Sequence, residues 1–129
     1  MSDELAFRLK SKKSFEEVSE ALQEKSVENQ FRVLAVHDVQ ATLAEKGFER
    51  GPLKIIEVCN SGFAYEALKK DIDVSMFMPC KFTVYRQDDA TVVTLALPTM
   101  ISKMLPESNL DSLALEVEDR LKKVMQEIV

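Results

Sequence analysis

Alternating and helical hydrophobic patterns follow one another along the chain and predict a fold of mixed strands and helices. Apolar and other residues alternate from Leu5 to Leu9, as expected for a half-buried strand. Apolar residues then recur at helical spacing after Ser14, and Ser14 with Glu17 has the form of a capping box. We expect this helix to end between Lys25 and Asn29. The chain therefore begins with a strand followed by a helix.

The remaining pattern continues to alternate until a late hairpin. We expect a strand Phe31 to Val36, a short helix that Asp38 caps and Gly47 stops, and a strand Leu53 to Cys59. A helix Gly62 to Lys70, capped by Asn60 or Ser61, should then lead to a hairpin of a long strand Val74 to Tyr85, a turn Gln87 to Ala90 and a strand Thr91 to Leu97. The chain should end with a helical turn after Pro98 and a long amphipathic helix capped near Ser108 or Asn109. The order β-α-β-α-β-α-β-β-α favours an α+β two-layer sandwich with a mixed or mainly antiparallel sheet and helices packed on it. At 129 residues the chain is expected to form one domain, 1–129.

Charge and composition narrow the class of protein. The net charge is -5 and the two signs are interspersed, which disfavours nucleic-acid binding. No apolar run approaches the roughly 20 residues that span a bilayer, and the acidic start lacks the features of a signal peptide. We therefore expect a cytoplasmic protein without a membrane segment. Its two cysteines should be reduced, although a transient redox pair stays open.

The two cysteines lie beside residues that interrupt regular structure. Cys59 ends a strand just before a helix, and one interpretation is a reactive thiol whose pKa the helix amides lower. The alternative is a buried thiol that packs at the strand end, with Asn60 only capping the helix. Cys80 shares strand parity with a core-like set of residues, namely Met76, Met78, Phe82 and Val84. A bulge at Pro79 is the feature that would turn Cys80 toward Cys59.

Several of these segments resemble a known family. They are Asp38-Val39-Gln40, the strand end Glu57-Val58-Cys59-Asn60, Ala64 and Ala67-Leu68 after it, and Met78-Pro79-Cys80-Lys81-Phe82-Thr83-Val84-Tyr85. From about Phe7 to Leu105 the chain resembles the prokaryotic family catalogued as domain of unknown function 302, although Ser61 stands where the usual pattern has a proline. The resemblance implies a single-domain α+β fold without an established activity. It directs attention to Cys59, Asn60, Pro79 and Cys80, with Asp38 as a second choice.

Metal and acid-base sites are the other chemical options. Two converging thiols with Met76 or Met78 would suit Cu(I), and the thiols with His37 and an acidic residue would suit zinc. The cysteines are 21 positions apart rather than in a C-x-x-C pair, so the spacing supports neither metal, and no cofactor is assigned. His37 is also a possible general base oriented by Asp38. The alternatives are a solvated surface histidine and an Asp38 that serves only as a helix cap.

Three functions follow from these residues. The first is binding of a small molecule or metal at a cleft framed by Cys59-Asn60 and Pro79-Cys80, and it predicts one pocket that touches both cysteines. The second is a thiol redox enzyme in which Cys59 attacks and Cys80 resolves. The third is a homodimer that acts as an interaction module through a helix or a sheet edge. The sequence leaves open whether the protein is an enzyme.

Overall fold

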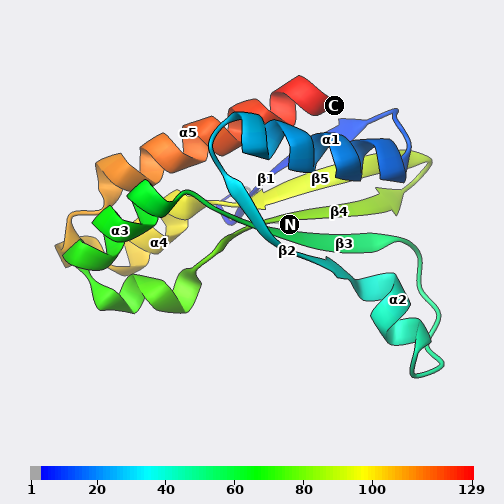
Figure 1. Cartoon of the computed structure of the whole chain (residues 1–129), viewed down its shortest axis with the longest axis horizontal. Coiled ribbons are helices and arrows are strands. Elements are labelled where there is room, and N and C mark those ends of the chain that lie inside the picture. The colour runs from blue at the N-terminus through cyan, green and yellow to red at the C-terminus, as the bar shows by residue number, and fades with distance from the viewer. Residues whose placement is uncertain (1–3) are drawn as a thin grey trace.

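Five antiparallel strands form one sheet in the computed structural model, which describes residues 4–129 (Figure 1). The elements are β1 (Ala6–Ser11), α1 (Phe15–Glu28), β2 (Arg32–Asp38), α2 (Val39–Ala44), β3 (Leu53–Cys59), α3 (Ser61–Lys70), the 3-10 helix η1 (Ile72–Phe77), β4 (Cys80–Gln87), β5 (Ala90–Ala96), α4 (Pro98–Met104), the 3-10 helix η2 (Pro106–Ser108) and α5 (Asp111–Ile128). The strand order across the sheet is β1-β5-β4-β3-β2. This architecture confirms the predicted α+β fold with an antiparallel sheet.

Helices α1 and α5 lie side by side over one face of the sheet (Figure 1). The core forms between this helix layer and the sheet, and its largest fully buried side chains are Phe31, Phe82, Leu22, Ile56, Leu95, Leu121 and Met125. Full burial of one such side chain stabilises the fold by ~1.5–3 kcal/mol. Packing against the sheet thus fixes the two long helices, and with them the end of the molecule where α3 and α4 lie.

The predicted helix starts are set by local hydrogen bonds. In α1 the Glu17 N–H donates to Ser14 Oγ over 3.1 Å, and the Ser14 N–H donates to Glu17 Oε1 over 3.3 Å. In α2 the Ala41 N–H donates to Asp38 Oδ1 over 3.0 Å. These contacts confirm the capping box and the Asp38 cap, because each satisfies an amide that the first helical turn leaves without a partner.

The late hairpin is also confirmed. β4 and β5 pair in antiparallel register, with Gln87 opposite Ala90. The two residues between them, Asp88 and Asp89, have φ angles of 49° and 63°. Aspartate tolerates this left-handed conformation better than most residues, so the two-residue turn follows from the sequence.

The expected strand from Val74 to Tyr85 is wrong in its first part, because β4 begins only at Cys80. Residues Ile72–Phe77 form η1 instead. The Asp73 N–H donates to Asp71 Oδ1 over 2.9 Å, which caps the turn. A local side-chain acceptor of this kind favours a turn over extended structure, and the alternation of apolar residues gives no information about this effect.

The grouping of Cys80 with the methionines before it fails for the same reason. The Met76 side chain is 70% exposed and does not belong to a core face. From Cys80 onward the alternation holds, since Phe82 and Val84 are fully buried and Cys80 packs against the core. Pro79 precedes β4 and does not bulge it, because a residue without an N–H suits the start of a strand better than its interior.

The last helix begins later than expected. Its N-cap position is occupied by Leu110, which makes no side-chain capping bond, and Asn109 takes a left-handed conformation with φ of 54°. The predicted apolar stripe is otherwise confirmed, as Leu110, Val117, Leu121, Val124 and Ile128 are buried. Within residues 4–129, no helix combines the length and the apolar character needed to cross a membrane.

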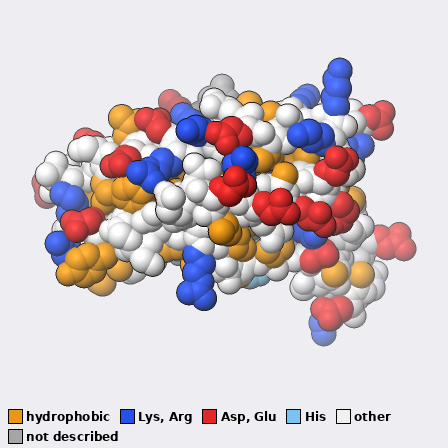
Figure 2. All heavy atoms as spheres, turned by 45° about the horizontal axis from the view of Figure 1, so that its top comes forward, with side chains coloured by type: hydrophobic (Ala, Val, Ile, Leu, Met, Phe, Trp, Pro, Cys, Tyr) orange, Lys and Arg blue, Asp and Glu red, His pale blue; other side chains and the backbone are white. Residues whose placement is uncertain are grey.

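The surface carries charges of both signs. Figure 2 shows acidic and basic side chains interspersed on the face that it presents, without an extended area of one sign. At one corner of the sheet α2 and the loop after it project away from the body, and α2 contains no buried residue (Figure 1). The molecule thus has two distinct regions besides its core, the projecting α2 and the opposite end formed by α3, η1, α4 and the start of α5.

Candidate functional site

A cavity of about 90 Å³ lies between the end of the sheet and the elements α3, η1, α4 and α5. Its wall is almost entirely apolar. The helices contribute Phe63, Ala64 and Ala67 from α3, Val74 and Phe77 from η1, Ile101 from α4, and Leu113, Ala114 and Val117 from α5. A single water molecule needs only about 10–15 Å³ of such cavity volume, so the cavity has room for a small ligand.

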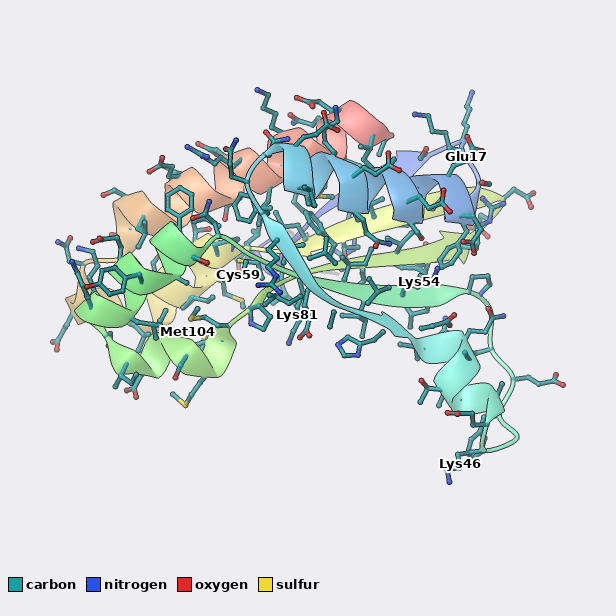
Figure 3. All side chains as sticks on the ribbon, in the orientation of Figure 1. Glu17, Lys46, Lys54, Cys59, Lys81 and Met104 are labelled. Atoms are coloured by element: carbon teal, nitrogen blue, oxygen red, sulfur yellow. The ribbon has the colours of Figure 1, made fainter. Side chains whose placement is uncertain are left out.

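The four residues that the sequence placed at a cleft all line this cavity. They are Cys59, Asn60, Pro79 and Cys80. β3 and β4 are antiparallel neighbours with Val58 opposite Cys80, so the end of one strand and the start of the other meet at the same edge. Cys59 lies where β3 passes into α3 (Figure 3). The structure therefore brings both cysteines to one pocket, through strand pairing and without a bulge at Pro79.

Asn60 holds the wall of the cavity in place. Its Oδ1 accepts the Phe63 N–H over 3.1 Å and so caps α3, and its Nδ2 donates to the Gln30 carbonyl over 3.0 Å. Both ends of the amide are used, which links the start of α3 to the segment before β2. The position of Asn60 at the cavity is therefore explained by these two bonds, which occupy one of the two N–H donors and one of the two acceptor positions of its amide.

Both thiols are held in the neutral form. Burial raises the pKa of Cys59, contrary to the lowering expected from the start of α3. Burial also raises the pKa of Cys80 to about 11, and the nearby Cys59, a second group that would become negative, adds to the effect. The cysteines are free and form no disulfide. Burial is the main cause of both shifts, because desolvation disfavours the charged form of a thiol.

His37 and Asp38 lie away from this cavity. His37 Nε2 is 3.0 Å from Glu57 Oε1, so the carboxylate beside the histidine is Glu57 and not Asp38. In the sheet His37 stands opposite Ile55, four residues along β3 from Cys59, which corresponds to ~13 Å. The structure does not bring the histidine to the thiols, and Asp38 serves α2 as its cap.

Comparison with known proteins identifies the family. The family model described as "Domain of unknown function DUF302" matches residues 7–128. The chain belongs to this family. In a comparison with solved structures, the chain is similar to one described as "Crystal structure of uncharacterized conserved protein DUF302 from Bacillus stearothermophilus". The two are 29% identical, with a TM-score of 0.92 over 97% of this chain and 98% of that chain. No curated protein matches.

The soft-metal option for this DUF302 protein is reduced to three sulfur-bearing residues. Cys59, Cys80 and Met78 line the cavity, whereas Met76 is largely exposed. Among residues 4–129, no group of three or more His, Cys, Asp or Glu residues is placed to hold a metal ion. The zinc set with His37 is therefore not assembled.

A buried carboxylate anchors one wall of the cavity. Glu118 Oε1 accepts the Thr99 N–H over 3.2 Å and the Thr99 hydroxyl over 2.6 Å, which caps α4 from α5. The other oxygen, Oε2, lies 3.3 Å from Lys122 Nζ. Burial alone would raise the pKa of Glu118, but the hydrogen bonds from Thr99 and Lys122 outweigh it and leave the pKa lowered. Glu118 thus positions the helix that carries Ile101 into the cavity.

A second polar contact joins the segments next to the cavity. The Ser108 hydroxyl donates to Asp71 Oδ2, which ties η2 to the junction of α3 and η1. This bond and the Asp73 N–H lower the pKa of Asp71. We call this pair the Asp71–Ser108 clasp.

Sequence reasoning did not find the aromatic part of the cavity. Phe31 and Phe63 stack with ring centroids 6.4 Å apart, and the Arg120 guanidinium lies 5.1 Å from the Phe63 ring centroid. Phe77 adds a third ring from η1. The sequence signals for this region were the apolar stripe of the last helix and the apolar positions Phe63, Ala64, Ala67 and Leu68 of the helix after Asn60. Both indicated core contacts without indicating that a space would remain.

Proposed function

We propose that this DUF302 protein binds a small, uncharged and largely apolar ligand in the cavity beside Cys59 and Cys80. The observation that carries the proposal is an apolar cavity whose few polar side chains are either engaged or neutral. Asn60 uses both ends of its amide, and Ser102 donates its hydroxyl to the Thr99 carbonyl over 2.8 Å. A charged ligand would lose its hydration there and find no partner of opposite charge to offset the loss.

The shape of the wall favours a ligand with a flat or ring-like part. The Phe31, Phe63 and Phe77 rings line the cavity, and aromatic side chains contact other rings through offset or edge-to-face arrangements. The two neutral thiols supply soft, polarisable surface next to these rings. A small aromatic or cyclic compound with at most one weak hydrogen-bonding group fits this chemistry.

A thermal-shift series tests the proposal. Benzene, toluene, indole and cyclohexanol serve as probes, and each should raise the midpoint of unfolding of the wild-type protein, since a ligand that binds only the folded state stabilises it. In the Ala67→Leu variant the larger side chain fills part of the cavity, so the shift should be lost. The Ala44→Leu variant adds the same side chain at an exposed position of α2 and should retain it. Equal responses of wild type and Ala67→Leu would rule out the cavity as the binding site.

A soft metal ion is the second occupant that a specific observation favours. The sulfur atoms of Cys59, Cys80 and Met78 belong to residues that line the same cavity, and Cu(I) prefers such ligands. The raised pKa of both thiols opposes it, because a thiolate is the ligand form. The same pKa shifts oppose the redox function, which needs an attacking thiolate. Native mass spectrometry after addition of Cu(I) under reducing conditions distinguishes the metal from an organic ligand.

The cellular setting belongs to the same proposal. Two free cysteines without a disulfide suit a reducing compartment, and we place the protein in the cytoplasm on that ground. Fractionation of cells with an antibody against the protein tests this placement. Recovery of the protein in an oxidising compartment, with its two cysteines oxidised, would contradict this placement.

A further inference from the structure

β2 is an edge strand that exposes apolar side chains. It pairs only with β3, so its outer side has no strand beside it. The Leu34 side chain is 50% exposed and the Val36 side chain 39% exposed. Proteins commonly protect edge strands with charged side chains, especially lysine, or with proline, because an open edge invites pairing with another chain. β2 contains no proline and carries its charged side chains only at its two ends, Arg32 and Asp38, whereas the opposite edge, β1, carries Arg8 and Lys10 within the strand.

The pairing of β2 with β3 is irregular at Leu34. Val33 stands opposite Val58 and Ala35 stands opposite Glu57, so the register shifts between them. Leu34 has no residue opposite it on β3. The most exposed apolar side chain of the strand therefore lacks the cross-strand neighbour that normally stabilises a sheet residue.

We propose that β2 pairs antiparallel with β2 of a second copy of this chain, about a two-fold axis at Ala35. In this register Leu34 stands opposite Val36 of the second copy, and Arg32 stands opposite Asp38 of the second copy. The symmetry generates each pair twice. Two five-stranded sheets then join into one continuous sheet, and the edge of each copy is covered.

Charge complementarity selects this register over its neighbours. A shift by one residue puts Arg32 opposite His37 or opposite Val39, and neither residue is acidic. Across the part of the chain that the structure describes, the Arg32 side chain forms no hydrogen bond or ion pair, so it is available to a partner. Asp38 uses Oδ1 for the cap of α2 and keeps Oδ2 for a second contact.

The projecting α2 supplies further contact area. A helix of six residues is too short to be stable alone, and α2 buries no residue within its own chain. It begins directly after Asp38, so in the paired arrangement it continues past the end of β2 along the second copy. The loop after it carries Phe48, which is 64% exposed, and Figure 3 shows Lys46 near its tip, away from the sheet. Stable interfaces bury about 1,200–2,000 Å² in total, and contact through α2 adds to what the strands alone bury.

A charge exchange between two variants tests the pairing by sedimentation velocity of the full chain. The wild-type protein should form dimers. Arg32→Asp and Asp38→Arg should each weaken association by roughly tenfold or more, because like charges then face one another twice. An equimolar mixture of the two variants should dimerise again, since each pair in the heterodimer joins an acidic and a basic side chain.

Three control measurements keep the outcome decisive. Asp38→Asn retains a good helix cap and removes only the charge, so it should weaken association without unfolding α2. Lys10→Asp makes the same change of charge on the β1 edge and should leave association unchanged. Circular dichroism reports whether each variant is folded. A wild-type monomer at every concentration, dimers that the single variants do not weaken, or a mixture that fails to dimerise would each overturn the proposal.

Discussion

The Ser108 hydroxyl donates a hydrogen bond to the Asp71 carboxylate and so ties η2 to the junction of α3 and η1. The chain before Asp71 lines the cavity through Ala67, and the chain after Ser108 lines it through Leu110. The Asp71–Ser108 clasp therefore joins two wall segments that the sequence separates by 37 positions. If the cavity admits its ligand between these segments, the clasp controls how fast the ligand enters and leaves.

The first prediction concerns ligand exchange. Ser108→Ala should speed up both association and dissociation of a bound aromatic probe, because one contact that holds the two segments together is lost while the cavity wall is unchanged. The dissociation constant should change less than either rate. Stopped-flow measurements check this, with Ser112→Ala in α5 as an exposed control. Unchanged rates in Ser108→Ala would show that the ligand takes another path.

The second prediction concerns the stability that Glu118 provides. Glu118→Ala should destabilise the fold by ~1–3 kcal/mol, because the Thr99 donors lose their acceptor in a site that is largely closed to water. Urea unfolding followed by circular dichroism measures the change. Glu116→Ala is the matched control, since Glu116 is exposed and faces Arg120 at 3.6 Å. A loss no larger than that of the control would contradict the role of Glu118 as the cap of α4.

The third prediction concerns acid sensitivity. The pKa of Glu118 is lowered in the folded state, so its contribution to stability is fully present above the ordinary carboxyl value of 4.5 and is lost as pH falls below it through the folded-state pKa. Asp71, whose ordinary value is 3.8, acts in the same direction. The midpoint of thermal unfolding should therefore drop between pH 5 and pH 3. This decrease of the midpoint should be smaller in Glu118→Ala than in the wild-type protein. An equal decrease in both would show that other carboxylates cause the acid sensitivity.

The fourth prediction concerns thiol reactivity. Both cysteines should react with iodoacetamide more slowly than free cysteine at pH 7, and Cys80 more slowly than Cys59, because a thiol with a raised pKa carries little thiolate. Rates measured by mass spectrometry at each site check the order. A bound apolar probe should slow Cys59 further. A Cys59 that reacts faster than free cysteine would instead support the thiol redox function.

Local signals in the sequence predicted the elements that local contacts determine. Ser14 with Glu17, Asp38 and Asn60 each act within three residues of their own position, so their helix starts could be read without the fold. The strand Leu53–Cys59 was predicted with the observed bounds because it is flanked by a loop and a cap. Its partner β4 was predicted too long, because the turn at Asp71 depends on one acceptor that apolar alternation does not detect.

The cavity could be predicted only in part. The strand ends at Cys59 and Cys80 were recognisable as places where a sheet meets loops, and strand pairing brings them together. The walls from η1, α4 and α5 come from distant segments, and the capping of α4 by Glu118 joins positions 19 residues apart. The direction of the pKa shift at Cys59 depends on how deeply these walls bury it, and burial raises the pKa, as the interpretation of Cys59 as a packed thiol implies.

The most direct test of ligand binding in the cavity is a titration of the methyl-labelled protein with toluene, followed by NMR. The proposal predicts shifts at the methyl groups of Val58, Val74, Leu113 and Val117, which line the cavity, and no shifts at Leu34 or Val36 on the sheet edge. The Ala67→Leu variant should show none of the cavity shifts. Unchanged cavity methyl signals at saturating toluene, or changes confined to the sheet edge, would contradict the proposed binding function.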